Sequence, residues 1–115
     1  MNPIPSFRRR DADILTIQEP GNVLDPIDVI FLDHEPGRGR LIVRCYSMAW
    51  TAWFGSMGEK YSVRSFVRQA PTFYIADALL YGPGDLQRTR ARKLQAVYVA
   101  RIVNAIKLAL LGDVS

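Results

Sequence analysis

Hydrophobic residues alternate with polar ones in the first half of the chain and recur at helical spacing in the second half. Short β-like runs lie at residues 14–17, 27–32 and 41–46, and proline, glycine or charged residues bound them. Their β-branched content suits extended strands. Pro20-Gly21 closes the first run, and Gly37 to Arg40 supplies the positive-φ positions of a loop between the second and third. We therefore expect antiparallel strands joined by short turns.

Residues 41–54 predict a hairpin with two different faces. If Ser47-Met48 is a two-residue loop, Cys45 pairs with Trp50, and successive side chains alternate between the faces. The face expected in the core carries Leu41, Val43, Cys45, Trp50, Ala52 and Phe54. The opposite face carries Ile42, Arg44, Tyr46, Thr51 and Trp53, with Arg44 near enough to stack on a ring. Ser-Met is not a favoured two-residue turn, and a slip of one residue would exchange the faces.

Three helices are predicted after the strands. Their expected N-terminal caps are Ser62, Thr72 and Asp85. The first helix ends at Pro71, the second at Gly82-Pro83-Gly84, and the third runs to Gly112. On the third, the apolar face consists of Tyr98, Val99, Ile102, Val103, Ile106 and Leu110, with Arg101, Asn104 and Lys107 on the opposite side.

This order predicts an α+β fold: a three- or four-stranded antiparallel meander followed by two short helices and one long C-terminal helix. Residues 1–10, with two prolines and an arginine triplet, are expected to be a flexible basic lead, and residues 11–115 a single domain. One alternative stays open: the long helix could instead cover the Trp53 face, whose aromatics would then be ordinary core.

The composition limits how the chain can be stabilised and where in the cell it is expected. The chain has 115 residues and is 49% hydrophobic, so it can bury a core without metals or disulfides. Its one cysteine, Cys45, cannot form an internal bridge. The basic cluster near the start has no apolar run after it, unlike a secretory signal. The apolar run 94–111 is interrupted by Arg101, Asn104 and Lys107, unlike a membrane span. We expect a cytoplasmic protein with no membrane contact.

Charge is divided unequally along the chain. The net charge is +4, but residues 1–35 hold three basic and seven acidic side chains, whereas residues 36–115 hold twelve basic and four acidic ones. Such a division either creates a positive face or simply gives a solvated surface. Four cations start the long helix: Arg88, Arg90, Arg92 and Lys93. They either clamp phosphates or an acidic partner, or bridge loop carboxylates on an exposed helix end.

The chain offers little catalytic chemistry. Gly55 and Gly58 are too close for a phosphate loop, and Lys60 is not followed by serine or threonine. A Gly-x-x-Gly clamp should join two helices, whereas this one follows a strand, so a tight turn is expected. His34 lies between two acids, but consecutive residues do not converge on one ion, so we expect a loop residue. We predict no enzyme, no cofactor and no metal.

Four segments of the chain carry a resemblance to a known group of proteins: Gly39-Arg40-Leu41-Ile42-Val43-Arg44-Cys45-Tyr46, Ala49-Trp50-Thr51-Ala52-Trp53-Phe54-Gly55, Met57-Gly58 and Tyr74-Ile75-Ala76-Asp77-Ala78-Leu79. They resemble a group of small uncharacterised proteins of tailed phages and prophages. The resemblance covers about half the chain. In that group a Gly-Lys-like turn often stands at Ser47-Met48, and tryptophan often replaces Phe54. The resemblance implies a phage origin and a location in the host cytoplasm, and it assigns no catalytic residue.

Small phage domains without catalytic residues often act by occupying a host surface, and some block defence complexes such as CRISPR effectors. Our leading hypothesis is therefore a binding protein, of the anti-defence type, for a host protein or nucleoprotein complex. Its expected contacts are Arg44, Tyr46, Trp53, Arg88, Arg90, Arg92 and Lys93. A second hypothesis is direct nucleic-acid binding by sheet aromatics and arginines. A third is an enzyme or small-ligand binder built around His34 and the Gly55–Gly58 turn. The sequence leaves the oligomeric state open.

Overall fold

Four antiparallel strands precede three helices. The structure, a computed structural model, describes residues 3–21, 24–81 and 90–113. Its elements are β1 (Asp13–Ile17), β2 (Ile27–Glu35), β3 (Arg38–Cys45), β4 (Met48–Phe54), α1 (Val63–Gln69), α2 (Thr72–Tyr81) and α3 (Arg90–Gly112). The strands pair in the order β1-β2-β3-β4, so the sheet is a meander. The predicted α+β fold is confirmed.

The hairpin between β2 and β3 is tighter than predicted. Glu35 pairs with Arg38, so the loop is only Pro36-Gly37. Gly37 has a φ of +79°, and a Cβ atom there would lie 2.9 Å from the backbone of Gly58, so this position requires glycine. The predicted loop was wrong beyond Gly37, because the alternation of Arg38, Arg40 and Ile42 already follows the period of a strand.

The turn between β3 and β4 lies at Tyr46-Ser47, one residue earlier than predicted. Cys45 pairs with Met48 and Val43 with Trp50, so the predicted pairing of Cys45 with Trp50 was wrong. Moving a two-residue loop by one position changes the partners by two residues, and side chains alternate with a period of two, so both faces are preserved. The predicted buried face is confirmed: Leu41, Val43, Cys45, Trp50, Ala52 and Phe54.

Helix α1 begins at its predicted cap. The Ser62 hydroxyl accepts a hydrogen bond from the Ser65 backbone N–H at 3.2 Å, and the Ser65 hydroxyl accepts one from the Ser62 N–H at 2.9 Å. In α2, however, Thr72 is already helical, because the Pro71 carbonyl accepts the first helical bond, from Ile75 at 3.3 Å. The cap predicted at Thr72 was therefore one residue late. The third predicted cap, Asp85, lies outside the described residues.

Helix α3 buries the predicted apolar face. Its fully buried side chains are Val99, Ile102, Val103, Ile106 and Leu110. Arg101 and Asn104 are exposed on the far side, as predicted. Lys107 differs, because its Nζ donates to the carbonyls of Val67 at 3.2 Å and Arg68 at 2.9 Å, and to that of Ala70. A long flexible stem lets this lysine reach the C-terminal carbonyls of α1 from the edge of the apolar face.

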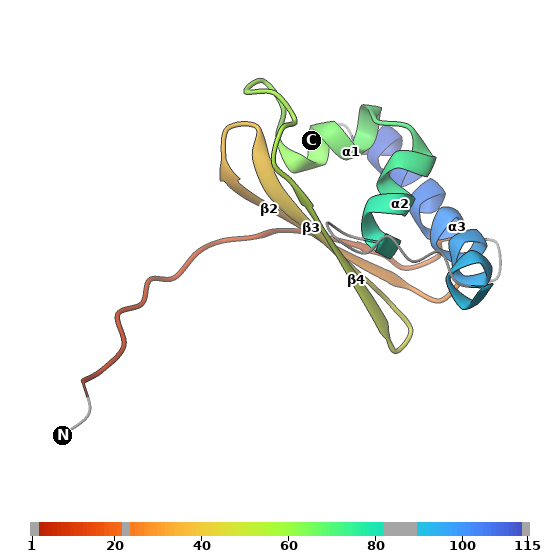
Figure 1. Ribbon diagram of the computed structural model, residues 1–115, viewed down its shortest axis with the longest axis horizontal. Coiled ribbons are helices and arrows are strands. Elements are labelled where there is room, and N and C mark those ends of the chain that lie inside the picture. Colours follow the sequence, from red (N-terminus) through yellow and green to blue (C-terminus); the bar gives the residue numbers. More distant parts are fainter. Residues whose placement is uncertain (1–2, 22–23, 82–89, 114–115) are drawn as a thin grey trace.

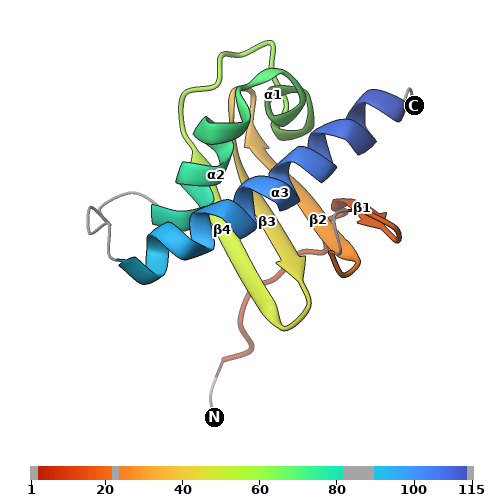
Figure 2. The same ribbon diagram turned by 90° about the vertical axis from the view of Figure 1, so that its right-hand side faces the viewer.

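All three helices cover the same face of the sheet, and α3 runs diagonally across its strands (Figures 1 and 2). The Trp50 ring lies 6.0 Å from the Tyr98 ring of α3, and the Tyr98 hydroxyl donates to Cys45 Sγ at 3.4 Å. That hydrogen bond, followed by desolvation, raises the pKa of Tyr98 to about 12. The covered face is therefore the Trp50 face, and the alternative that α3 covers Trp53 is excluded.

Two contacts fix α1 between the sheet and the end of α3. The Arg64 Nε lies 2.7 Å from Asp13 Oδ2 in β1, and its Nη1 lies 2.8 Å from Asp113 Oδ2 beyond α3. The hydrogen bond from Arg64 lowers the pKa of Asp13. At Gly39 of β3, an added Cβ would lie 2.3 Å from Val63 Cγ2, so the first turn of α1 sits directly on the strand.

Two further segments bear on the predictions. Residues 3–12 are exposed and extend away from the sheet without secondary structure (Figure 1).

In α3, Leu94–Gly112 is long and apolar enough to cross a membrane by length and composition, with a mean hydropathy of 1.5. Core helices meet the same criterion, and Ile102 and Ile106 of this segment are fully buried inside the domain. We therefore describe α3 as the core helix of the fold.

Candidate functional site

The face of the sheet opposite the helices is left uncovered by the described residues (Figure 1). We call it the open face. Its side chains are Ile14, Thr16, Asp28, Ile30, Leu32, His34, Arg40, Ile42, Arg44, Ala49, Thr51 and Trp53. Because the four strands pair in a continuous register up to a β-bulge at His34, these side chains form rows that run across the sheet, each with its own chemistry.

The first row is polar and internally paired. Thr16 of β1, Asp28 of β2 and Arg44 of β3 are successive register partners. The Thr16 hydroxyl donates to Asp28 Oδ1 at 2.9 Å, and Arg44 Nε donates to Asp28 Oδ2 at 3.0 Å. These bonds, that from Arg44 foremost, lower the pKa of Asp28. Arg44 also donates to the Tyr46 carbonyl at 3.2 Å. The expectation that Arg44 stacks on a ring was wrong, because a cross-strand carboxylate holds its guanidinium.

The second row is aliphatic. Ile14, Ile30 and Ile42 are register partners on β1, β2 and β3, and Thr51 of β4 follows Ile42. Ile14 at the edge is 60% exposed, while Ile30 and Ile42 are half-buried by their neighbours on the sheet. Three adjacent β-branched side chains form an apolar strip that no described segment covers. Such a contiguous strip is the kind of surface that binds other macromolecules.

The third row, Leu32, Arg40 and Trp53 on β2, β3 and β4, ends in an aromatic and cationic cluster. The Arg40 guanidinium lies 5.6 Å from the centre of the Trp53 ring, and Arg40 Nη1 donates to the Thr51 hydroxyl at 3.1 Å. The His34 ring meets Trp53 edge-on at 5.2 Å. Trp53 keeps 37% of its surface exposed. Within the described residues Arg40 forms no ion pair, so its charge is available to a partner.

Tyr46 lies at the turn rather than on the strand. It was predicted on the open face, but the shift of the hairpin loop places it at the first turn position, with a φ of +59° and 70% exposure. Left-handed backbone is unfavourable for a bulky side chain. The aromatic ring therefore projects from the tip of the β3–β4 hairpin, beyond the rows of the sheet.

The arginine-rich start of α3 cannot be placed with these residues. Arg88 lies outside the described residues. Arg90, Arg92 and Lys93 belong to the first turns of α3, but their side chains are also outside the described part of the structure. Their role as a second contact stays a prediction.

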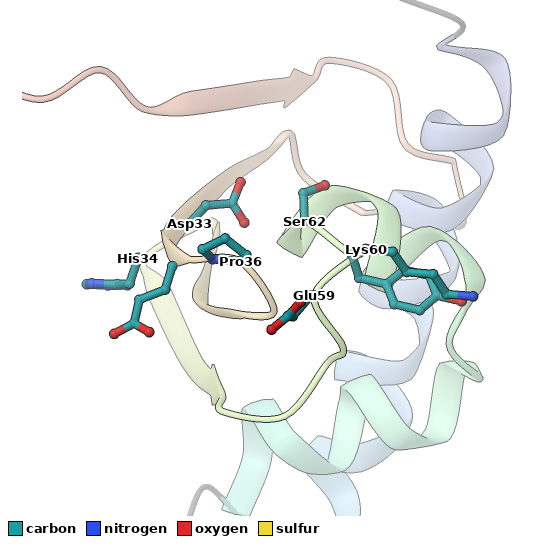
Figure 3. Close-up of a pocket in the computed structure, with 8 residues that line it drawn as sticks. Asp33, His34, Pro36, Glu59, Lys60 and Ser62 are labelled. Atoms are coloured by element: carbon teal, nitrogen blue, oxygen red, sulfur yellow. The ribbon is translucent and has the colours of Figure 1, made fainter.

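A hollow of about 440 Å³ lies where β2 ends and α1 begins (Figure 3). It is lined by Asp33, His34, Glu35, Pro36, Glu59, Lys60, Tyr61 and Ser62. Asp33 is committed to the fold, since its Oδ1 accepts a hydrogen bond from the Val63 N–H at 2.8 Å. His34 points away from Glu59 and Ser62 (Figure 3). It belongs to β2, so its prediction as a loop residue was wrong, because the hairpin is tighter than expected.

The third hypothesis, an enzyme or small-ligand site, combined His34 with the Gly55–Gly58 turn. The structure brings these segments to the same end of the sheet, because the Met57 N–H donates to the Gly37 carbonyl at 2.9 Å and the turn packs on the β2–β3 hairpin. Among the described residues, no group of three histidine, cysteine or acidic side chains is arranged to hold a metal ion. The third hypothesis stays a prediction.

Several open-face residues escaped the sequence analysis. Arg40 was assigned to a loop, and Ile14 and Ile30 were placed in strands without an assigned face. The signal for Arg40 was present, since Arg40, Ile42 and Arg44 have a spacing of two. The row of Ile14 and Ile30 depends on the register between separate strands, which no single segment encodes.

Comparison with known proteins gives one match. A family model, Phage_phiTE_072, described as a phage family, matches residues 7–94, which include the whole sheet, α1 and α2. No curated protein and no solved structure matches the chain.

Proposed function

The chain belongs to the phage family Phage_phiTE_072, and on this premise we propose that it is a non-enzymatic protein that binds a macromolecular complex of the bacterial host through its open face. The proposal includes action in the host cytoplasm and a role as an anti-defence inhibitor of the anti-CRISPR type. One observation carries it: a four-stranded sheet presents an uncovered isoleucine row, with an exposed tryptophan under an arginine at its side.

The arrangement suits a protein partner. Interface anchors are commonly tryptophan, tyrosine and arginine beside an apolar area that excludes water. Ile14, Ile30 and Ile42 supply the apolar area, and Trp53 with Arg40 supplies the anchor. Because Arg40 has no ion pair among the described residues, a partner carboxylate next to an apolar side chain would fit it best. Tyr46 adds an exposed ring at the tip of the hairpin.

The test is recovery of a partner by tagged full-length protein expressed in a bacterial host. The open-face variants Trp53→Ser and Ile14→Lys should each lose a stoichiometric partner that the unchanged protein retains. Both positions are exposed, so the variants should keep the melting temperature within a few degrees. Phe73→Glu is the matched control, because it puts a charge at an exposed apolar position of α2. Partner retention by both open-face variants would contradict the proposal.

Reversal of the helix cations tests the contribution predicted from sequence. The double variant Arg88→Glu and Arg92→Glu should release the partner if the start of α3 belongs to the interface. Circular dichroism checks that the variant is folded. If the reversed variant keeps the partner, the contact is confined to the sheet.

Nucleic-acid binding is the second candidate, and the contact between Arg40 and Trp53 favours it. Sheet proteins that bind single strands stack bases on several aromatic rings, whereas the described open face presents only the rings of Trp53 and His34. A mobility-shift titration with single-stranded DNA and RNA decides the matter. Nucleic-acid binding predicts affinity that falls steeply with added salt, by about tenfold or more between 50 and 200 mM for several phosphate contacts. Absence of binding at low salt ends this candidate.

A further inference from the structure

Helix α3 has a second apolar stripe on the side away from the sheet. Its members are Leu94, Val97, Arg101, Asn104, Leu108 and Leu111, and we call them the outer stripe. All six are exposed. The four apolar members are 69%, 58%, 65% and 67% exposed for Leu94, Val97, Leu108 and Leu111. In Figure 2, α3 crosses the front of the sheet.

The spacing of the outer stripe is that of a coiled-coil seam. The intervals between successive members alternate between three and four residues, which brings every member to one side of the helix. Scattered exposed leucines are normal on protein surfaces. Four large apolar side chains at heptad spacing over about 26 Å of helix are the pattern of a helix that packs on another helix.

The stripe is also symmetric about its own centre. When two copies of α3 lie antiparallel, Leu94 of one copy faces Leu111 of the other, and Val97 faces Leu108. At the middle, Arg101 faces Asn104. The same three pairs occur again on the other side of the two-fold axis, so each residue meets a partner of matching chemistry. A self-complementary patch of this kind is what a two-fold dimer requires.

The polar centre favours a second copy over a lipid bilayer. In the antiparallel pair, the Arg101 guanidinium can donate to the Asn104 amide oxygen of the other copy, and its long stem keeps the charge at the rim of the seam. Polar positions within an apolar seam fix register in coiled coils. Since the opposite side of α3 is buried on the sheet, a bilayer could meet the outer stripe only at the membrane surface, where Arg101 and Asn104 would interrupt the apolar side that such a helix inserts.

From this geometry we infer that the protein forms a homodimer by antiparallel packing of the outer stripe of α3 against the same stripe of a second copy. The seam lies on the helical side of the molecule, opposite the open face, so a dimer carries two open faces that point away from each other. The inference does not depend on the proposed function, since the partner is the chain itself.

Analytical ultracentrifugation of the full chain over a wide concentration range tests the dimer. The unchanged protein should approach twice the mass of one chain as the concentration rises. Val97→Glu and Leu108→Lys should each remain monomeric, because a charge then faces an apolar side chain. The double variant Val97→Glu, Leu108→Lys should recover the dimer, because antiparallel packing sets each glutamate against the lysine of the other copy.

The ultracentrifugation results distinguish an error in the orientation of the two helices from an error in the seam itself. A parallel dimer would place glutamate against glutamate, so failure of the double variant to recover would overturn the antiparallel arrangement. A monomer at every concentration, or a dimer that survives Val97→Glu, would overturn the seam itself. Ile14→Lys is the matched control, since it introduces a charge at a similarly exposed apolar residue on the open face and should leave the dimer intact. Circular dichroism confirms folding of each variant.

A flotation assay with phosphatidylcholine vesicles tests the other surface that the outer stripe could bind, a lipid bilayer. A monomer that floats with the vesicles, and sinks when Leu108 is replaced by lysine, would show that the outer stripe meets lipid and would overturn the dimer. Absence of flotation, together with concentration-dependent dimerisation, supports the seam.

Discussion

Tyr46 is strained in a way that its neighbours are not. It is the only described residue other than glycine with a positive φ, at +59°, and it lies at a hairpin position that usually holds glycine or asparagine. Left-handed backbone costs an L-residue with a Cβ roughly 1–2 kcal/mol. Since its ring is 70% exposed, packing in the described fold does not offset that cost. Strain kept at an exposed aromatic residue is consistent with a contact to a partner.

Tyr46→Gly is therefore expected to stabilise the protein while weakening partner binding. Glycine removes the strain but adds unfolded-state entropy, so the net gain in the free energy of unfolding is about 0.5–1 kcal/mol. Urea unfolding measures it. Ser47→Gly, at the next turn position without a positive φ, is the control and should destabilise by about 0.5 kcal/mol. A lower midpoint for Tyr46→Gly would refute the assignment of strain.

At the residue scale, the sequence predicted burial better than contacts. Alternation along β3 and β4 identified every buried side chain of the hairpin. The face on which a strand residue lies depends only on whether its position along the strand is odd or even. Contacts depend on register as well. Arg44 was expected near an aromatic ring, but its partner is Asp28, sixteen residues away on another strand. Nothing within either strand indicates that pairing.

Among the elements, α1 and β3 make the closest approach, at Gly39. A Cβ there would lie 2.3 Å from Val63 Cγ2 and 2.5 Å from the Leu32 carbonyl oxygen, and the second contact is with backbone. Gly39→Ala should therefore separate α1 from the sheet and lower the free energy of unfolding by about 2–3 kcal/mol. Thermal or urea unfolding checks this. Gly112→Ala, where an added methyl group meets nothing within 4 Å, should change stability little.

Arg64 joins three elements, and its contribution should depend on pH. Arg64→Met removes the bonds to Asp13 and Asp113 and should destabilise by about 1 kcal/mol at neutral pH, since the groups are partly exposed and screened by solvent. The pKa of Asp13 is lowered in the folded state, so this stabilisation is present above the ordinary carboxyl pKa. It disappears as the pH falls through the folded-state pKa.

Unfolding curves of the unchanged protein and of Arg64→Met should accordingly converge in acid, at pH values below the lowered pKa of Asp13. Arg68→Met is the matched control, because Arg68 lies on the exposed side of the same helix, and it should behave like the unchanged protein at every pH. A gap for Arg64→Met that stays constant into acid would assign its effect to packing over the Phe31 ring, 5.1 Å away.

At the scale of the whole molecule, the sequence predicted the order and type of the elements but did not decide which face of the sheet α3 covers. Two packings of α3 were compatible with the hairpin alone. The decision comes from β2, whose covered side presents Ile27, Val29 and Phe31 while its other side includes Asp28. Only one face of the assembled sheet is apolar throughout, and a long apolar helix buries more surface there. That comparison requires the strands to be aligned first.

The open face was harder to predict from the sequence than the core, because it depends on how separate strands are aligned. A row such as Ile14, Ile30 and Ile42 exists only after three separate strands have been brought into register. The outer stripe of α3 could have been found from sequence, because one helix contains it entirely. Its apolar spacing is weaker than that of the buried face that Ile102 and Ile106 occupy, because Arg101 and Asn104 interrupt it.

The position of α3 at the end of the described fold has a consequence during synthesis. A ribosome releases the meander first, and neighbouring strands can pair as they emerge, since each contacts the next along the chain. Helix α3, whose Tyr98 ring packs against Trp50, emerges after the other described elements. Until then the apolar surface that α3 covers is exposed to water, so premature termination before α3 would leave a fragment that aggregates or is degraded.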